Sequence, residues 1–308
     1  MEELNEEVSN EERVKIVQEF YNKAVQYEWE RIVGKPEFLL TCRMMDRYIK
    51  PSDSVLDIGG GPGRYSFYLA EKGCDVTLFD LSPENVNHVN KHSAESGIPV
   101  MAICGDAREV DTILSNVVDF NKDEHEIDIQ SSKNQFDHVL LMGPLYHLLE
   151  EQDRIKAINA ALRLLKPGGL LFAAFISMDG GLVFMLRELP EQFADPDEQR
   201  FLIPLVAGEN YSGAAFTQAF FINQHKVLPF MKQFGLEKLH LFGQEGVLAP
   251  NNHTFMEQSP EIKEALLEIS EKLYEKEEYL SWAEHLMYIG RKPLYSPREN
   301  LYIRPGEK

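Results

Sequence analysis

The chain has 308 residues, which is enough for one large core with an added lobe but short for three domains. Its 50 acidic and 31 basic residues give a formal net charge of -19 at pH 7. Such a charge repels phosphate backbones on average, so we expect no nucleic acid substrate, whereas a small molecule or a basic partner fits.

Composition also bears on the compartment. The cysteines Cys42, Cys74 and Cys104 lack metal-ligand spacing and are too few for a disulfide framework, so we expect no metal site and a reducing environment. No apolar run approaches the roughly 20 residues of a membrane span, and residues 1–12 are rich in glutamate without any basic residue, unlike a secretion signal. The sequence therefore predicts a cytoplasmic protein without membrane contact. The oligomeric state stays open, with a homodimer among the options.

Two amphipathic helices are predicted before the first strand. Residues 1–12 are expected to be a frayed acidic tail. The first helix has one apolar stripe, formed by Val14, Val17, Tyr21 and Val25. The second stripe follows Pro36, a residue that suits a first helical turn. We therefore expect an N-terminal helical cap over residues 1–50.

A buried strand followed by a glycine-rich turn comes next. Apolar residues surround Asp57, and the turn contains Gly59, Gly60, Gly61 and Gly63. This pattern predicts a parallel strand, a tight turn and a helix N-terminus, with backbone angles that a Cβ atom would forbid. A carboxylate at the carboxyl end of the strand, beside exposed N–H groups, suits the binding of an ammonium or hydroxyl group.

D-x-G-x-G-x-G at residues 57–63 resembles the first motif of class I S-adenosylmethionine-dependent methyltransferases, and it differs from the dinucleotide fingerprint G-x-G-x-x-G. The resemblance implies that Asp57 and the glycine backbone bind the amino acid end of S-adenosylmethionine, the expected cofactor. In that family a helical prefix covers the cofactor pocket, which makes Tyr21, Trp29 and Arg31 candidate lid residues. The alternative is that the two aromatic residues only pack and that Arg31 is solvated.

The second predicted strand ends at Asp80, 21 residues beyond Gly59. This is about the separation at which an acid meets a ribose diol in mononucleotide-binding α/β folds. A carboxylate suits that role because it accepts from two vicinal hydroxyls. The alternative is that Asp80 only caps the next helix, although Ser82 can supply that cap. Leu81 is a further candidate cofactor contact.

The third predicted strand, at residues 100–103, leads into a Gly-Asp-Ala run. In the family such a run sets the acid beside the adenine amino group, so Asp106 resembles that residue and Ala107 would touch the ring. An acid in a loop after a strand is also common without any ligand. Residues 119–135 are polar and acidic, and we expect a solvated surface insertion there.

The fourth predicted strand, at residues 136–142, opens into G-P-L-Y-H-L. A Gly-Pro turn at the carboxyl edge of a parallel strand is where ligands enter open α/β sheets. The run resembles that of small-molecule methyltransferases, which implies that Met142 and Gly143 lie near the donor. Tyr146 and His147 become candidates for acceptor binding and catalysis. His147 could act as a general base, or it could be a packed histidine at a helix start.

The fifth predicted strand, at residues 170–176, is preceded by K-P-G-G, another family feature. A long aromatic-rich segment follows at residues 178–223, and we interpret it as a lid or acceptor pocket. Its composition also fits an ordinary local core. Tyr211 and His225 are candidate acceptor contacts.

Two further strands, at residues 236–242 and 285–290, are expected near the C-terminus, with a helix starting at Pro260 between them. The resemblance implies an α/β fold with a Rossmann-like, seven-stranded, mostly parallel sheet, an antiparallel last strand and helices on both faces. The expected division is a cap at 1–50, a cofactor-binding core at 51–178, a lid and substrate insertion at 179–223, and the remaining core at 224–308.

The expected function is methyl transfer from S-adenosylmethionine to a small-molecule acceptor. A dehydrogenase of the same topology is disfavoured by the glycine spacing. A non-catalytic protein that senses the cofactor, or an assembly subunit, is the alternative from a different class. The residues identify neither the acceptor nor the methylated atom.

Overall fold

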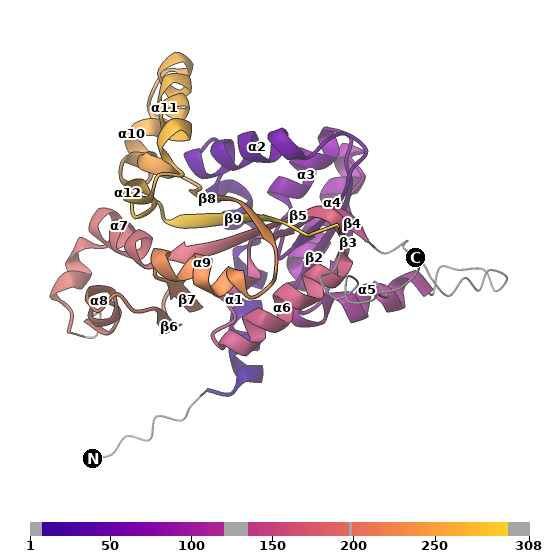
Figure 1. The fold of residues 1–308 in the computed structure, drawn as a ribbon, viewed down its shortest axis with the longest axis horizontal. Helices are drawn as coiled ribbons and strands as arrows, with labels where there is room; N and C mark the ends of the chain where they lie inside the picture. Colours follow the sequence, from indigo (N-terminus) through magenta and orange to yellow (C-terminus); the bar gives the residue numbers. More distant parts are fainter. Residues whose placement is uncertain (1–7, 120–134, 197–198, 295–308) are drawn as a thin grey trace, which may run out of the picture.

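The structure, a computed structural model, describes residues 8–119, 135–196 and 199–294. Within this part of the chain, nine strands form one sheet, and helices cover both of its faces (Figure 1). The predicted α/β fold with a mostly parallel sheet and an antiparallel last strand is confirmed. The predicted number of seven strands is wrong, because the segment after the fifth strand contributes two more.

The elements alternate between strands and helices over most of the chain. The strands are β1 (Ser54–Ile58), β2 (Asp75–Asp80), β3 (Met101–Cys104), β4 (Phe136–Leu141), β5 (Leu165–Ser177), β6 (Tyr211–Ala214), β7 (Gln218–Ile222), β8 (Glu237–Gly243) and β9 (His285–Arg291). The α-helices are α1 (Asn10–Arg31), α2 (Pro36–Tyr48), α3 (Arg64–Glu71), α4 (Pro83–Ser96), α5 (Val110–Asp119), α6 (Glu151–Leu164), α7 (Met178–Glu188), α8 (Gln199–Val206), α9 (Gln224–Lys232), α10 (Asn252–Met256), α11 (Pro260–Leu273) and α12 (Glu277–Leu280). Short 3-10 helices are η1 (Ala107–Glu109), η3 (Pro144–Tyr146), η4 (Pro190–Ala194) and η5 (Gly246–Asn251).

The parallel part of the sheet has the strand order β3-β2-β1-β4-β5. The chain builds outward from β1 to β3 and then returns to place β4 on the other side of β1. In open α/β sheets a ligand crevice forms where the strand order reverses in this way. The carboxyl ends of β1 and β4 therefore mark the expected position of the site.

Beyond β5 the sheet divides. β9 runs antiparallel to β5 from Leu170 to Ile176, and β8 pairs antiparallel with β9. The β6–β7 hairpin joins the carboxyl end of β5 through Ile176 and Ser177. These two strands come from the aromatic segment after β5, which explains the extra strands. The hairpin extends the sheet at its ligand edge.

Side chains alternate between two cores, one on each face of the sheet. Val55 packs with residues of α2, α3 and α4, whereas its neighbour Leu56 packs with residues of α5, α6 and α9. Leu140 and Val139 of β4 divide in the same way. Successive residues of a strand point to opposite faces, so apolar runs in these strands fill both cores at once.

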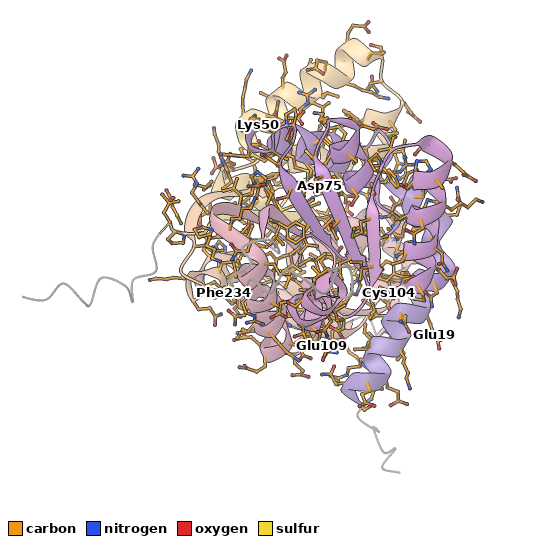
Figure 2. All side chains as sticks on the ribbon, turned by 90° about the vertical axis from the view of Figure 1, so that its right-hand side faces the viewer. Glu19, Lys50, Asp75, Cys104, Glu109 and Phe234 are labelled. Atoms are coloured by element: carbon orange, nitrogen blue, oxygen red, sulfur yellow. The ribbon has the colours of Figure 1, made fainter. Side chains whose placement is uncertain are left out.

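Helix α1 begins at Asn10, because Ser9 and Glu12 form a capping box. The expectation of a frayed tail over residues 1–12 is therefore wrong from residue 10 onward, and residues 1–7 lie outside the described part. Figure 2 shows Asp75, at the start of β2, and Cys104, at the end of β3, at opposite edges of the sheet. Glu19 of α1 lies on the side of Cys104, so this part of α1 lies near the carboxyl edge of the sheet.

The segment after β5 folds into α7, η4, α8 and the β6–β7 hairpin. It has a small core of its own, formed by Ile176, Met178, Met185, Phe201, Ala219 and Phe221. The predicted surface insertion falls largely on residues 120–134, outside the described part. None of the described helices has the length and hydropathy needed to cross a membrane.

Candidate active site

A cavity of about 810 Å³ lies at the carboxyl edge of the sheet. This volume is within the range of small-molecule pockets. The glycine turn, α1, the ends of β2 to β4 and the segment after β5 all contribute to its wall. Most of the predicted site residues line it: Tyr21, Arg31, Asp57, Gly59, Gly60, Gly61, Asp80, Leu81, Asp106, Ala107, Met142, Gly143, Tyr146, His147 and Tyr211.

Two predicted site residues do not line this cavity. Gly63 is the N-cap of α3 and has a φ of 93°, so it provides the left-handed backbone conformation that leads from the turn into the helix. His225 lies in the first turn of α9 with 63% of its side chain exposed, and its Nδ1 is 3.6 Å from Glu277 Oε1. The expectation that His225 contacts the acceptor is corrected, because the start of α9 directs this side chain to solvent.

The glycine turn brings the loops after β1 and β4 into contact. Gly59 has a φ of 73°, and a Cβ atom built there would overlap the ring of Pro144. Gly61 also has a positive φ, of 57°, but a Cβ atom there would meet nothing within 4 Å. The turn thus packs tightly against the β4 loop on one side and leaves its backbone open on the other.

Asp57 is almost fully buried at the end of β1, with an exposed fraction of 1%. Ser66 Oγ donates a hydrogen bond to its Oδ2 at 2.7 Å. Burial raises the pKa of Asp57 to about 7, and the nearby carboxylate of Asp80 acts in the same direction. A cation bound at this point would restore the ionised form.

Asp80 is held in a fixed orientation by three donors. Its Oδ2 accepts from Gly61 N at 2.8 Å, and its Oδ1 accepts from Ser82 N at 2.8 Å and Asn85 Nδ2 at 3.1 Å. Burial raises its pKa against the effect of these bonds. Ser82 Oγ caps α4 by accepting from Asn85 N at 3.1 Å, so the cap does not require the carboxylate of Asp80.

Asp106 has a partner that the sequence reasoning missed. Arg108 Nε lies 3.0 Å from Oδ1, and Arg108 Nη2 lies 2.6 Å from Oδ2. Burial alone would raise the pKa of Asp106, but the bonds from Arg108 lower it. Both carboxylate oxygens therefore have a partner already, and a ligand would share them with Arg108. The neighbouring Ala107 is buried against the cavity.

His147 uses both ring nitrogens within the protein. Nδ1 is 3.0 Å from the carbonyl oxygen of Gln218, and Nε2 is 2.7 Å from Tyr21 Oη. A carbonyl oxygen only accepts, so Nδ1 carries the proton and Nε2 accepts from Tyr21. Burial lowers the pKa of His147 to about 4. This geometry favours the packed histidine over the general base.

Tyr146 and Tyr211 present rings rather than free hydroxyls. Tyr146 donates its hydroxyl to the carbonyl oxygen of Met142 at 2.9 Å, and burial raises its pKa. Tyr211 donates to the carbonyl oxygen of Ala214 at 2.6 Å, and its ring packs on Phe201 and Phe221. Both tyrosines therefore form apolar wall on the side of the aromatic segment.

Arg31 is held in a charged cluster at the cavity wall. Its Nε donates to Glu28 at 2.9 Å and its Nη1 to Glu37 at 3.0 Å. The alternative of a solvated Arg31 is therefore wrong. Trp29 does not line the cavity, because its ring packs 3.4 Å from the guanidinium carbon of Arg64.

Glu37 and His285 also line the cavity, although no sequence motif marks them. A histidine at the first position of a mostly apolar strand was the available signal for His285. Its strand lies next to β5, and the carboxyl end of β5 belongs to the ligand edge.

Comparison with known proteins agrees with this geometry. Residues 21–241, well over half of the chain, match the family model described as a methyltransferase domain. The chain belongs to the methyltransferase domain family. Among curated relatives of this methyltransferase-domain chain is a ubiquinone biosynthesis O-methyltransferase of Xanthomonas campestris pv. campestris (strain B100), 33% identical over 153 residues. The match covers 47% of the chain and 55% of that relative, so the chain spans about half the length of the curated relatives it matches.

Solved structures show the same fold at low identity. One is the 1,6-didemethyltoxoflavin-N1-methyltransferase of Burkholderia thailandensis with bound S-adenosylhomocysteine, at 14% identity and a TM-score of 0.55. It covers 92% of the methyltransferase-domain chain and 91% of its own. Another is the [4+2]-cyclase SpnF, at 17% identity and a TM-score of 0.51, covering 91% and 96% of the two chains. The same fold therefore also carries a cyclase, so the reaction has to be argued from the site.

Proposed function

We propose that the chain transfers a methyl group from S-adenosylmethionine to an oxygen atom of a small-molecule acceptor. The observation that carries the proposal is the arrangement of Asp57, Asp80 and Asp106 at the ends of three adjacent strands, around a glycine turn in one shared cavity. The name of the relatives supports an oxygen acceptor. The aromatic segment after β5 supports an apolar acceptor because it lines the same cavity.

The residues fit the donor. The open side of Gly61 allows close approach to the backbone. Asp80 has a fixed carboxylate whose Oδ2 accepts one bond and keeps a lone pair for a ribose hydroxyl. Asp57, neutral at low pH and ready to ionise near pH 7, suits an ammonium group. Leu81 and Ala107 offer apolar surface for an adenine ring.

S-adenosylmethionine supplies an activated methyl group on a sulfonium. The protein's own work is then to bind donor and acceptor in line and to exclude water. Proximity of this kind contributes roughly 7 to 11 kcal/mol in favourable cases. Neither His147 nor Tyr146 offers a free base, since each is already bonded within the protein. We therefore assign both to the positioning of the acceptor ring rather than to proton transfer. A hydroxyl acceptor then has to lose its proton to solvent water, so that its oxygen attacks the methyl group as an oxyanion and S-adenosylhomocysteine leaves.

Calorimetry with S-adenosylmethionine, S-adenosylhomocysteine and NAD tests the donor site. We expect binding of the first two and none of NAD, and saturation by NAD alone would contradict the proposal. A screen of metabolite fractions with radiolabelled donor then tests transfer. Donor binding without any labelled product would favour the non-catalytic cofactor-binding protein instead.

A further inference from the structure

His285 opens β9 at the ligand edge of the sheet. It pairs in register with Ile176, near the carboxyl end of β5, and its ring centroid is 6.4 Å from that of Tyr146. Its side chain lines the cavity and is 17% exposed. The residue thus lies on the side where the β4 loop and the aromatic segment meet, which is the acceptor side in the proposed function.

Glu245 fixes the orientation of this imidazole. Glu245 Oε1 lies 2.6 Å from His285 Nδ1, and Oε2 accepts from the backbone N–H of His285 at 3.1 Å. Glu245 is itself 3% exposed. A carboxylate bonded to both positions holds the Nδ1 proton in place. Glu245 occupies Nδ1, so Nε2 is the ring atom available to a ligand.

The surrounding charges keep the ring protonated. Burial disfavours the charged form, but Glu245, the residue before η5, and Glu37 on α2 raise the pKa of His285 to about 9, while Arg31 on α1 opposes them. Glu284, the preceding residue, is paired with Arg187 at 2.7 Å. Near neutral pH the imidazole is therefore cationic, and a cationic imidazole can only donate hydrogen bonds.

We propose that His285, positioned by Glu245, is a specificity-determining residue whose Nε2–H donates to an oxygen atom of the methyl acceptor. This assignment rests on the proposed methyl transfer and narrows its substrate class. The acceptor carries a carbonyl or ionised oxygen in addition to an apolar ring, and an amine at that position is rejected. The hydrogen bond orients the ring within the aromatic wall.

A bound cation is the competing explanation. Glu37, Glu245 and His285 each offer a ligand atom within 4.8 Å of the others. Arg31 already neutralises part of the charge of Glu37, and the protonated ring neutralises Glu245. These ion pairs favour a protonated His285 over a metal ion bound in this cluster.

The first test is an NMR titration of the full chain with 15N-labelled histidine. His285 is expected to titrate above pH 8, and Glu245→Gln is expected to bring its titration down toward the ordinary value. Titration of the wild-type His285 near pH 6.5 would overturn the proposal. A stoichiometric change of the His285 signals on adding Zn²⁺, reversed by chelator, would overturn it in favour of the cation.

The second test measures binding of fragment probes in the presence of S-adenosylhomocysteine. Acetophenone offers a carbonyl oxygen, and α-methylstyrene replaces that oxygen with carbon. Benzoate is the anionic probe and benzylamine the cationic probe. Wild type is expected to favour acetophenone or benzoate over α-methylstyrene by about tenfold, with shifts at His285. A stronger response to benzoate than to acetophenone assigns an ionised oxygen, and the reverse assigns a carbonyl.

His285→Gln is expected to remove that preference without changing the affinity for S-adenosylhomocysteine. The matched control is His240→Gln, because His240 on β8 also pairs with a glutamate, Glu275, at 3.0 Å but lies outside the cavity. If His285→Gln keeps the preference for acetophenone or benzoate over α-methylstyrene, His285 is not the hydrogen-bond donor to the acceptor. That outcome leaves the proposed methyl transfer unaffected. If the wild type does not bind S-adenosylhomocysteine, the result instead counts against the proposed function.

Discussion

Tyr21 and His147 face each other in the cavity wall, with the phenolic oxygen 2.7 Å from Nε2 and the rings edge to face at 5.2 Å between centroids. Tyr21 belongs to α1 and His147 to the loop after β4. The pair therefore ties the N-terminal helix to the β4 loop, two segments far apart in the sequence.

Tyr21→Phe removes the donor to a part-buried nitrogen. We expect the free energy of unfolding to fall by about 1–3 kcal/mol, because Nε2 of His147 is left unpaired. Urea unfolding measures the change. Tyr27→Phe is the control on the same helix, since Tyr27 is 65% exposed, and we expect about 0.5 kcal/mol or less. Equal effects of the two substitutions would contradict the assigned bond.

Asp80→Ala tests the donor site. Loss of charge-assisted hydrogen bonds is expected to weaken S-adenosylmethionine binding by about 1.5–3 kcal/mol, as measured by calorimetry. Asp75→Ala changes the exposed acid at the other end of the same strand and is expected to leave the dissociation constant unchanged. An unchanged constant in Asp80→Ala would remove Asp80 from the site.

Asp57 predicts a pH dependence. Burial raises its pKa from 3.8 to about 7, so its contribution to folding stability is complete below pH 3.8 and is lost as the pH rises through about 7. Donor binding has the opposite sign, since an ammonium selects the carboxylate. Affinity is expected to fall about tenfold per pH unit below 7, with proton release detected by calorimetry in buffers of different ionisation enthalpy. Asp57→Asn should remove the pH dependence of donor affinity. If the dependence persists in this variant, it arises from another titrating group.

Gly59→Ala and Gly97→Ala form a matched pair. The two glycines have φ values of 73° and 72°, so alanine meets a similar backbone strain of about 1–2 kcal/mol at both. At Gly97 a Cβ atom meets nothing within 4 Å, whereas at Gly59 it overlaps Pro144. We therefore expect Gly59→Ala alone to abolish donor binding. Comparable donor affinity in the two variants would show that the Gly59–Pro144 contact does not shape the site.

Features encoded by neighbouring residues could be predicted from the sequence. The glycine turn, the position of Asp80 and the Ser82 cap each depend on residues a few positions apart and on one strand direction. The shared edge of β1, β2 and β4 then follows from the rule for parallel strands. This is why most donor-side candidates line one cavity.

Features that depend on side-chain packing could not be predicted in this way. The Arg108 contact to Asp106 is local, but it requires a particular side-chain conformation. Glu245 meets His285 across 40 residues, and neither is marked by a motif. His225 was selected by residue type alone, and the direction of the first turn of α9 decides its exposure. The β6–β7 hairpin was hidden within an aromatic composition that fits helix, strand or loop.

The two bonds of His147 have a mechanical consequence. His147, in the loop after β4, is bonded to α1 through Tyr21 and to β7 through Gln218. One side chain therefore connects three segments that enclose the cavity. Because α1 also contacts β7 directly, we expect movement of the N-terminal helix to disturb the hairpin, and the reverse. We expect a substitution that breaks either bond of His147 to loosen both walls of the cavity, so that bound molecules leave faster.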